Sequence, residues 1–209
     1  MPLQNRVDPF GALFASPARG TMMGNRGGRF HRDDRALGAR RFASRQWICC
    51  VLDFKGRQRD VWGRYYTELF FLDEVTALAA GHRPCFECRR AEAIAFAEAW
   101  TRARGERRAA RAGEMDAVLA RERLDGRAKR LHRMPAADLP DGAMVARGGD
   151  AFAVNGGVLL RWTPEGYIPD GGRIPAGAID VLTPPAIVAA LRHGYRPRWH
   201  GSAAIAACD

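Results

Sequence analysis

Two cysteines three residues apart, Cys85 and Cys88, lie between two helical patterns and constrain the fold of this chain more than any other feature. At this spacing one metal ion takes both thiolates, while the amides between them point at the sulfurs. The segment 73–80 before the pair has the pattern of a short helix, with Asp73 as N-cap and Gly81 as the left-handed residue after its end. The sequence therefore predicts a zinc knuckle on a turn between two helices.

The remaining ligands of this Zn²⁺ site are left open by the sequence. Cys49 and Cys50 are adjacent on a predicted strand, so their side chains point to opposite faces and at most one of them faces the metal. His31 and His82 are further candidates for the metal shell. The cysteine pair also has a second interpretation, a thiol-disulfide redox pair at a helix start, which would make the chain a thiol redox protein.

The run from Asp73 to Cys88 resembles the second half of the zinc-binding domain of the Ada family. In that family a short helix, a Gly-aromatic-Arg-Pro turn and a Cys-x-x-Cys pair complete a cysteine-rich zinc site on a small hairpin. Upstream, strands are expected over 47–54 and 66–72, joined through a turn at 55–57. The resemblance covers about residues 47–90 and implies an Ada-like zinc module that binds DNA, with a role in repair.

One part of the family pattern is missing. Ada-type domains carry their other two zinc ligands about where Gln58, Arg59 and Asp60 stand in this chain, and none of these is a cysteine. Methyl acceptance by a zinc-bound cysteine is therefore not implied here, and whether the chain is an enzyme stays open.

The charge of the chain points to a polyanionic partner. Arginine and lysine number 33 against 23 aspartate and glutamate residues, which gives a formal net charge of +10, and neutralising phosphates releases counterions. Codon bias explains why nearly all of this charge is arginine, but it does not explain the surplus over acids. We therefore expect DNA or RNA as the partner. The expected phosphate contacts are Arg26, Arg83, Arg89, Arg90 and Arg130.

Aromatic residues accompany the arginines that flank the predicted strands. Trp47, Trp62, Tyr65 and Tyr66 either stack on bases or pack in the core, and we expect Trp47 in the core. A glycine- and arginine-rich stretch over 19–31 has the composition of an anion-binding nest, or of a flexible loop.

A nucleic-acid hydrolase, of lesion-cleaving or nuclease type, is the competing function. It would use the glycine-rich loop and draw a base or nucleophile from isolated polar residues. The candidates are Asn25, His31, Glu68 and His132. Zinc with three protein ligands and an open position would be catalytic, whereas a fourth protein ligand would make it structural.

The rest of the chain predicts an α+β protein packed as one compact body. It divides into a glycine- and arginine-rich segment with the zinc module over 1–100, a basic helical connector over 101–139, and a β-hairpin and helix segment over 140–209. In the last segment we expect strands over 143–146, 150–154 and 158–162, a loop to Gly177, and a helix capped by Thr183.

No apolar run is long enough to span a bilayer, and the N-terminus lacks the core of a signal peptide. We therefore expect a cytoplasmic protein without membrane contact. Its five cysteines fit a reducing compartment, and Cys208 is expected to have no role.

Overall fold

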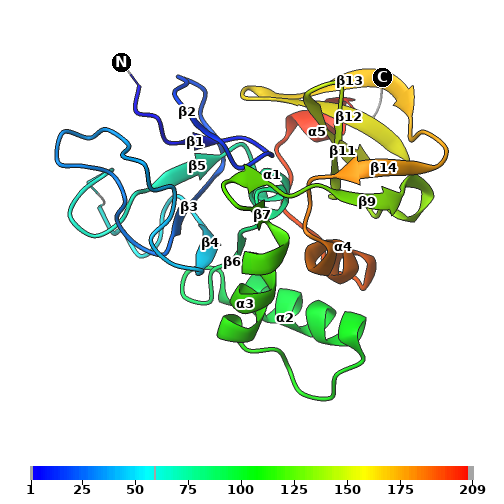
Figure 1. Cartoon of the computed structure of the whole chain (residues 1–209), viewed down its shortest axis with the longest axis horizontal. Helices are drawn as coiled ribbons and strands as arrows, with labels where there is room; N and C mark the ends of the chain where they lie inside the picture. The colour runs from blue at the N-terminus through cyan, green and yellow to red at the C-terminus, as the bar shows by residue number, and fades with distance from the viewer. Residues whose placement is uncertain (1, 59, 207–209) are drawn as a thin grey trace.

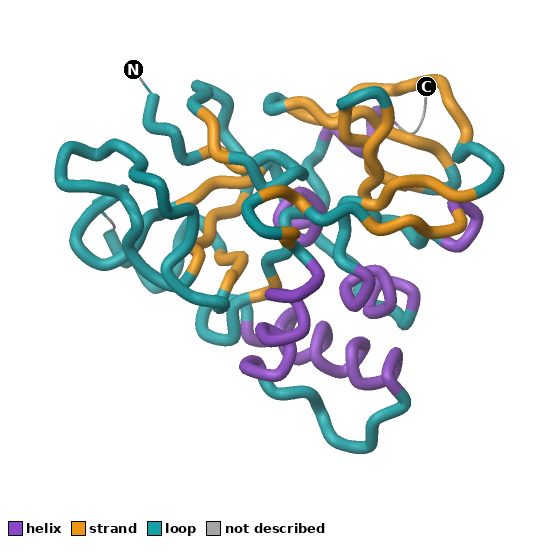
Figure 2. Tube along the Cα trace, in the orientation of Figure 1, coloured by secondary structure: helices purple, strands orange, loops and turns teal. Residues whose placement is uncertain are grey.

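The structure is a computed structural model that describes residues 2–58 and 60–206, so Cys208 lies outside the described residues. Within these residues two six-stranded sheets lie on the two sides of the molecule, with a short helix between them and the longer helices below (Figure 1). The mixture of helices and strands confirms the α+β class predicted from the sequence. The N-terminal side contains long loops between short strands (Figure 2). No helix among the described residues is long and apolar enough to cross a membrane.

The first sheet carries the cysteines. Its strands follow the order β2-β1-β5-β3-β4-β6. They are β1 (Arg6–Val7), β2 (Leu13–Phe14), β3 (Met22–Arg26), β4 (Trp47–Cys50), β5 (Leu69–Phe71) and β6 (Arg83–Pro84). The hairpin expected between strands over 47–54 and 66–72 does not form, because β3 lies between β4 and β5 and pairs antiparallel with both.

One face of this sheet packs on the first helix, α1 (Glu74–Ala79). Met22 and Phe71 lie opposite each other on β3 and β5, and both are fully buried in one cluster with Ala77. Asp73 caps α1 as expected, since its carboxylate accepts from the Thr76 amide at 2.9 Å.

The longer helices form a second layer below the sheets (Figure 1). They are α2 (Arg90–Arg104), α3 (Ala112–Glu122) and α4 (Pro185–Arg192). Phe96 and Trp100 of α2 pack with Leu119 of α3 and Leu191 of α4 in one buried cluster. The predicted basic connector therefore contributes a helix to the core. A 3₁₀ turn, η1 (Ala136–Asp138), and a short ribbon of β7 (Leu124–Asp125) and β8 (Ala128–Lys129) follow α3.

The second sheet has the order β13-β12-β11-β10-β14-β9. Its strands are β9 (His132–Pro135), β10 (Met144–Arg147), β11 (Asp150–Asn155), β12 (Val158–Thr163), β13 (Gly166–Arg173) and β14 (Ala178–Val181), and α5 (Ser202–Ala206) packs near β13. The sequence predicts β10, β11 and β12, but a loop in place of β13. Pro169 lies in β13, which is an edge strand of this sheet. Proline is tolerated in an edge strand because only one side of the strand pairs with a neighbour.

The start of α4 also differs from expectation. Pro184 is the N-cap, and the Thr183 hydroxyl instead accepts a hydrogen bond from the Met144 amide at 2.8 Å. Thr183 therefore joins the helix to the second sheet rather than capping it.

Two buried carboxylates at the start of α1 join the two halves of the chain. Asp73 accepts from the Tyr167 hydroxyl at 3.2 Å and from the His200 amide at 3.0 Å. Glu74 makes two 2.7 Å contacts with the guanidinium of Arg89. It also accepts from the Tyr195 hydroxyl at 2.5 Å. We call these two carboxylates and their partners the α1 hub.

Removing one partner of the hub should be costly. We expect Glu74→Ala to destabilise the fold by about 3–5 kcal/mol, because it leaves a buried guanidinium without a counter-charge. Urea unfolding followed by circular dichroism measures this loss. Asp125→Ala is the matched control, since Asp125 pairs with Arg130 at 3.5 Å on the surface and should cost less than about 1 kcal/mol. Equal losses for the two variants would contradict a stabilising role of the hub.

A group of three cations lies near Trp47, and two of them, Arg26 and Arg123, are buried. The guanidinium carbons of Arg26 and Arg123 lie 4.0 and 4.1 Å from the centroid of the Trp47 ring, so two cations contact one indole. The Lys129 ammonium donates to the Ala79 carbonyl beside them. Burial, and then the charges of Arg26 and Arg123, lower the pKa of Lys129 to about 7.

This lowered pKa makes stability depend on pH. Between pH 7 and about 10.4, the unfolded chain keeps a proton on Lys129 that the folded chain releases. The free energy of unfolding therefore rises with pH in this window, by at most about 1.4 kcal/mol per pH unit from this group. Lys129→Met should remove that rise in urea titrations at pH 7, 8 and 9, whereas Lys55→Met, an exposed control, should not. Parallel curves for wild type and Lys129→Met would refute the assignment.

Candidate metal centre

The register of β4 against β3 decides which of the two adjacent cysteines faces outward. Cys50 lies opposite Met23, and Cys49 lies opposite Gly24. Because neighbouring residues of a strand point to opposite faces, Cys49 is directed to the core that contains Phe71. Its sulfur lies 3.7 Å from Nη1 of Arg89. Cys50 is directed to the other face.

The short strand β6 then places the cysteine pair beside Cys50. It runs parallel to β4, with Pro84 opposite Cys49, and the Cys85 amide donates to the Cys49 carbonyl at 3.0 Å. Among the described residues, the sulfurs of Cys50, Cys85 and Cys88 form a cluster whose members all lie within 4.8 Å of one another. Zinc–sulfur bonds of about 2.3 Å in a tetrahedral site put sulfurs roughly 3.8 Å apart. The cluster therefore suits a metal ion after a small contraction.

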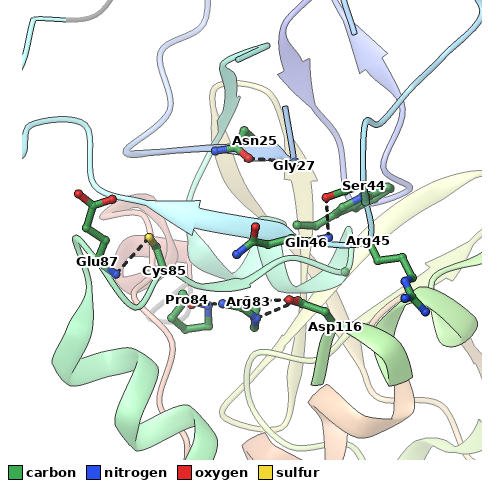
Figure 3. A network of polar contacts seen from close by, with 12 residues as sticks. Asn25, Gly27, Ser44, Arg45, Gln46, Arg83, Pro84, Cys85, Glu87 and Asp116 are labelled. Carbon is green, nitrogen blue, oxygen red and sulfur yellow. Dashed lines mark hydrogen bonds and ion pairs between the residues drawn. The ribbon is translucent and has the colours of Figure 1, made fainter. Parts of the chain in front are cut away.

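The electrostatics of the cluster also suit a cation. Hydrogen bonds from the thiols of Cys50 and Cys88 lower the pKa of Cys85 to about 2. The hydrogen bond of Cys50 with Cys85, and then its hydrogen bond with Cys88, raise the pKa of Cys50. The Glu87 amide donates to the Cys85 sulfur at 3.4 Å (Figure 3). A metal ion that bound this cluster would displace thiol protons, because the ligand form of cysteine is the thiolate.

The two candidate histidines do not join the cluster. The His31 ring stacks on Trp62 at 5.1 Å, and its Nδ1 lies 2.8 Å from the Thr67 hydroxyl. His82 is fully buried against Trp47, with ring centroids 5.0 Å apart. In residues 2–58 and 60–206, no further cysteine, histidine or carboxylate completes the set of three sulfurs.

A cavity of about 960 Å³ opens beside the cluster. Its floor is the outward face of the first sheet, with Met23, Ile48 and Cys50. We call it the cysteine cavity. Its wall is formed by loop residues from 57–58 and 60–66, namely Arg57, Gln58, Asp60, Gly63, Arg64, Tyr65 and Tyr66.

Two of the four predicted catalytic candidates lie in this cavity. Asn25 and Glu68 line it, and they are the chain neighbours of Gly24 and Leu69, which lie opposite each other on β3 and β5. His31 lies behind the wall, against Trp62. His132 lies elsewhere, with its Nε2 2.7 Å from the Glu122 carbonyl. The glycine-rich stretch contributes Asn25 and Gly27 to the cavity lining.

The predicted phosphate contacts divide into buried and exposed arginines. Arg83 makes a two-pronged ion pair with Asp116 at 2.9 and 2.8 Å (Figure 3). Arg89 is held in the α1 hub, and Arg26 is buried on Trp47. Arg90 and Arg130 are exposed. Phosphate binding by all five stays a prediction, and the three buried guanidinium groups already have partners inside the protein.

Sequence reasoning missed Arg57, Arg64 and Gln46, which also line the cysteine cavity. The available signal is the run Arg64-Tyr65-Tyr66, where a cation precedes two aromatic residues in a loop. Of the four aromatic residues considered from the sequence, Trp47 and Trp62 are buried, as expected for Trp47. Tyr65 and Tyr66 are exposed.

Three comparisons with known proteins found no relative of this chain. No protein-family model matches the chain, and neither the curated proteins nor the solved structures contain a significant match. The resemblance to Ada-type domains therefore stays a prediction that rests on the residues from Asp73 to Cys88.

Proposed function

We propose that this protein is a zinc-containing nucleic-acid-binding protein, acting in DNA repair or in the processing of DNA or RNA, and that the cysteine cavity is its binding site. The observation that carries the proposal is that three cysteine sulfurs lie within 4.8 Å of one another and that the three cysteines line one cavity. The wall of the same cavity carries arginine and tyrosine side chains.

The donor set favours zinc. Cys50, Cys85 and Cys88 offer three soft sulfur ligands, and zinc is the common divalent ion that takes thiolates in tetrahedral sites. When bound, zinc supplies a Lewis acid with a fourth position for water or a ligand atom.

The wall of the cavity favours nucleic acid. Arg57 and Arg64 are exposed there, and the chain as a whole carries a surplus of ten positive charges. Tyr65 and Tyr66 are 72% and 48% exposed, which leaves their rings free to stack. Cations that contact phosphates beside aromatic rings that stack on bases are the usual elements of single-strand binding.

A nucleic-acid hydrolase is the second candidate, and a specific observation favours it. Asn25 and Glu68 line the same cavity as the three sulfurs. The Glu68 carboxylate accepts from the Trp62 amide at 2.7 Å, so its orientation is fixed and it is available to hold a proton from a bound ligand. Release of cleaved product from a labelled oligonucleotide would distinguish this function from binding alone.

Metal content tests the zinc assignment with a matched pair of variants. We expect about one equivalent of zinc in the native protein by mass spectrometry, a large loss in Cys50→Ser, and retention in Cys49→Ser. The two residues are neighbours with the same chemistry, and only Cys50 belongs to the cluster.

Full zinc in Cys50→Ser would refute the assignment. A native protein that contains no metal and forms a reversible Cys85–Cys88 disulfide would instead support the redox interpretation.

Salt dependence tests the cavity as the nucleic-acid site. Binding of a labelled oligonucleotide, followed by fluorescence anisotropy between 50 and 200 mM salt, should weaken steeply. Arg57→Ala and Arg64→Ala should each lower the slope of log affinity against log salt by roughly one. Arg127→Ala, an exposed arginine on the turn of the β7–β8 ribbon, is the control. Identical slopes in all three variants would place the contacts outside the cavity.

A further inference from the structure

The shape of the cysteine cavity restricts what kind of nucleic acid can enter it. Its volume of about 960 Å³ is at the upper end of the range for small-molecule sites, roughly 300–1,000 Å³. The three cysteines of the cluster line it. A base inside a duplex is stacked between its neighbours, so it enters a cavity of this size only after it leaves the stack.

Amide groups inside the cavity match the edges of bases. The Asn25 side-chain carbonyl accepts from the Gly27 amide at 3.0 Å, which fixes the amide plane. Its nitrogen points away from Gly27, and Gln46 extends from the start of β4 on the same side (Figure 3). Asparagine and glutamine amides both donate and accept, as base edges do.

The wall is held by a strained residue. Trp62 has a φ of +59°, a conformation that a bulky residue rarely adopts. Glu68 holds it there twice, since the Glu68 carboxylate accepts from the Trp62 amide at 2.7 Å and the Glu68 carbonyl accepts from the indole nitrogen at 3.0 Å. Local strain persists where surrounding contacts impose it, and it clusters at binding sites. The backbone conformation of Trp62 sets the direction in which the chain continues to Arg64, Tyr65 and Tyr66.

The two tyrosines are exposed although they line a cavity. Tyr65 and Tyr66 are 72% and 48% exposed, and the guanidinium carbon of Arg64 lies 5.7 Å from the Tyr65 ring centroid. An aromatic ring beside a guanidinium at a cavity mouth offers one surface for a base and one charge for its phosphate.

We propose that the cysteine cavity accepts one unpaired nucleotide, whose base lies against Tyr65 or Tyr66 with its edge toward the amides of Asn25 and Gln46, and whose phosphate contacts Arg57 or Arg64. This rests on the proposed nucleic-acid-binding function and names its ligand class. A free nucleotide and a nucleotide within a single strand share this chemistry.

Anisotropy with a single-stranded oligonucleotide and its duplex tests the proposal. The native protein should bind the single strand at least tenfold more tightly. We expect at least one of the variants Tyr65→Ala and Tyr66→Ala to bind the single strand roughly tenfold more weakly. The affinity of that variant for the duplex should not change. The matching phenylalanine substitution should restore affinity. Phe42→Ala is the control, since Phe42 is a 42% exposed aromatic residue that does not line the cavity.

A strand that carries 5-iodouridine should also crosslink to Tyr65 or Tyr66 under ultraviolet light, as located by mass spectrometry. If uridine monophosphate competes with the oligonucleotide, a free nucleotide is sufficient for binding. If it does not compete, binding requires a nucleotide within a strand. Equal binding of single strand and duplex, or unchanged affinity in both alanine variants with zinc retained, would overturn the inference and leave the proposed function standing. Failure to bind any nucleic acid would overturn the proposed function itself.

Discussion

The buried ion pair between Glu74 and Arg89 is the interaction on which the placement of the cysteine turn depends. Arg89 directly follows Cys88, and Glu74 begins α1, so the pair fixes the turn that carries two cysteines to the helix behind the sheet. Glu74 also binds Tyr195 and the Arg198 amide, which come from the C-terminal segment. The buried charges of Glu74 and Arg89 require such complete pairing, because a buried charge without a partner strongly destabilises the folded state. The position of the cysteine turn thus depends on residues more than a hundred positions away.

The two faces of β4 have different surroundings, since one packs in the core and the other lines the cavity. Cys49 lies on the face that meets the core and the Arg89 guanidinium, where a small side chain is required. Cys50 lies on the face that forms the cavity floor. A shift of one residue in the pairing with β3 would exchange them, because the side chains of a strand alternate. The long pairing of β3 between β4 and β5 is therefore what keeps a sulfur in the cavity.

Local signals in the sequence predicted much of this arrangement. The cap at Asp73, the end of α1 at Gly81 and the spacing of Cys85 and Cys88 depend on neighbours in the chain, and the α+β class follows from the patterns of such segments. The choice of Cys50 over Cys49 was not available, because it depends on a strand more than twenty residues away. Strand pairing at that separation leaves no local pattern.

Residue type alone does not tell which arginines of the chain are buried. Arginine is mostly exposed in proteins, and a basic chain suggests phosphate contacts, but Arg26, Arg83 and Arg89 are among the most buried side chains here. Their carboxylate and aromatic partners come from distant segments, such as Asp116 on α3 and Trp47 on β4. Arg57 and Arg64, which line the cavity together with Arg83, lie in an irregular loop with no periodic signal.

The position of Cys50 relative to Cys85 has a topological consequence. A metal ion bound by both would close a ring of about 35 residues of chain, which contains the whole cavity wall, β5 and α1. Such a crosslink acts as a disulfide does, because it removes conformations from the unfolded chain and restricts how far the ring can open in the folded one. The ring also contains Glu74, whose partner Arg89 directly follows Cys88, the third cysteine of the cluster. A bound metal would therefore be a second crosslink of the segment that the ion pair already fixes, and chelation would remove the metal without removing the ion pair.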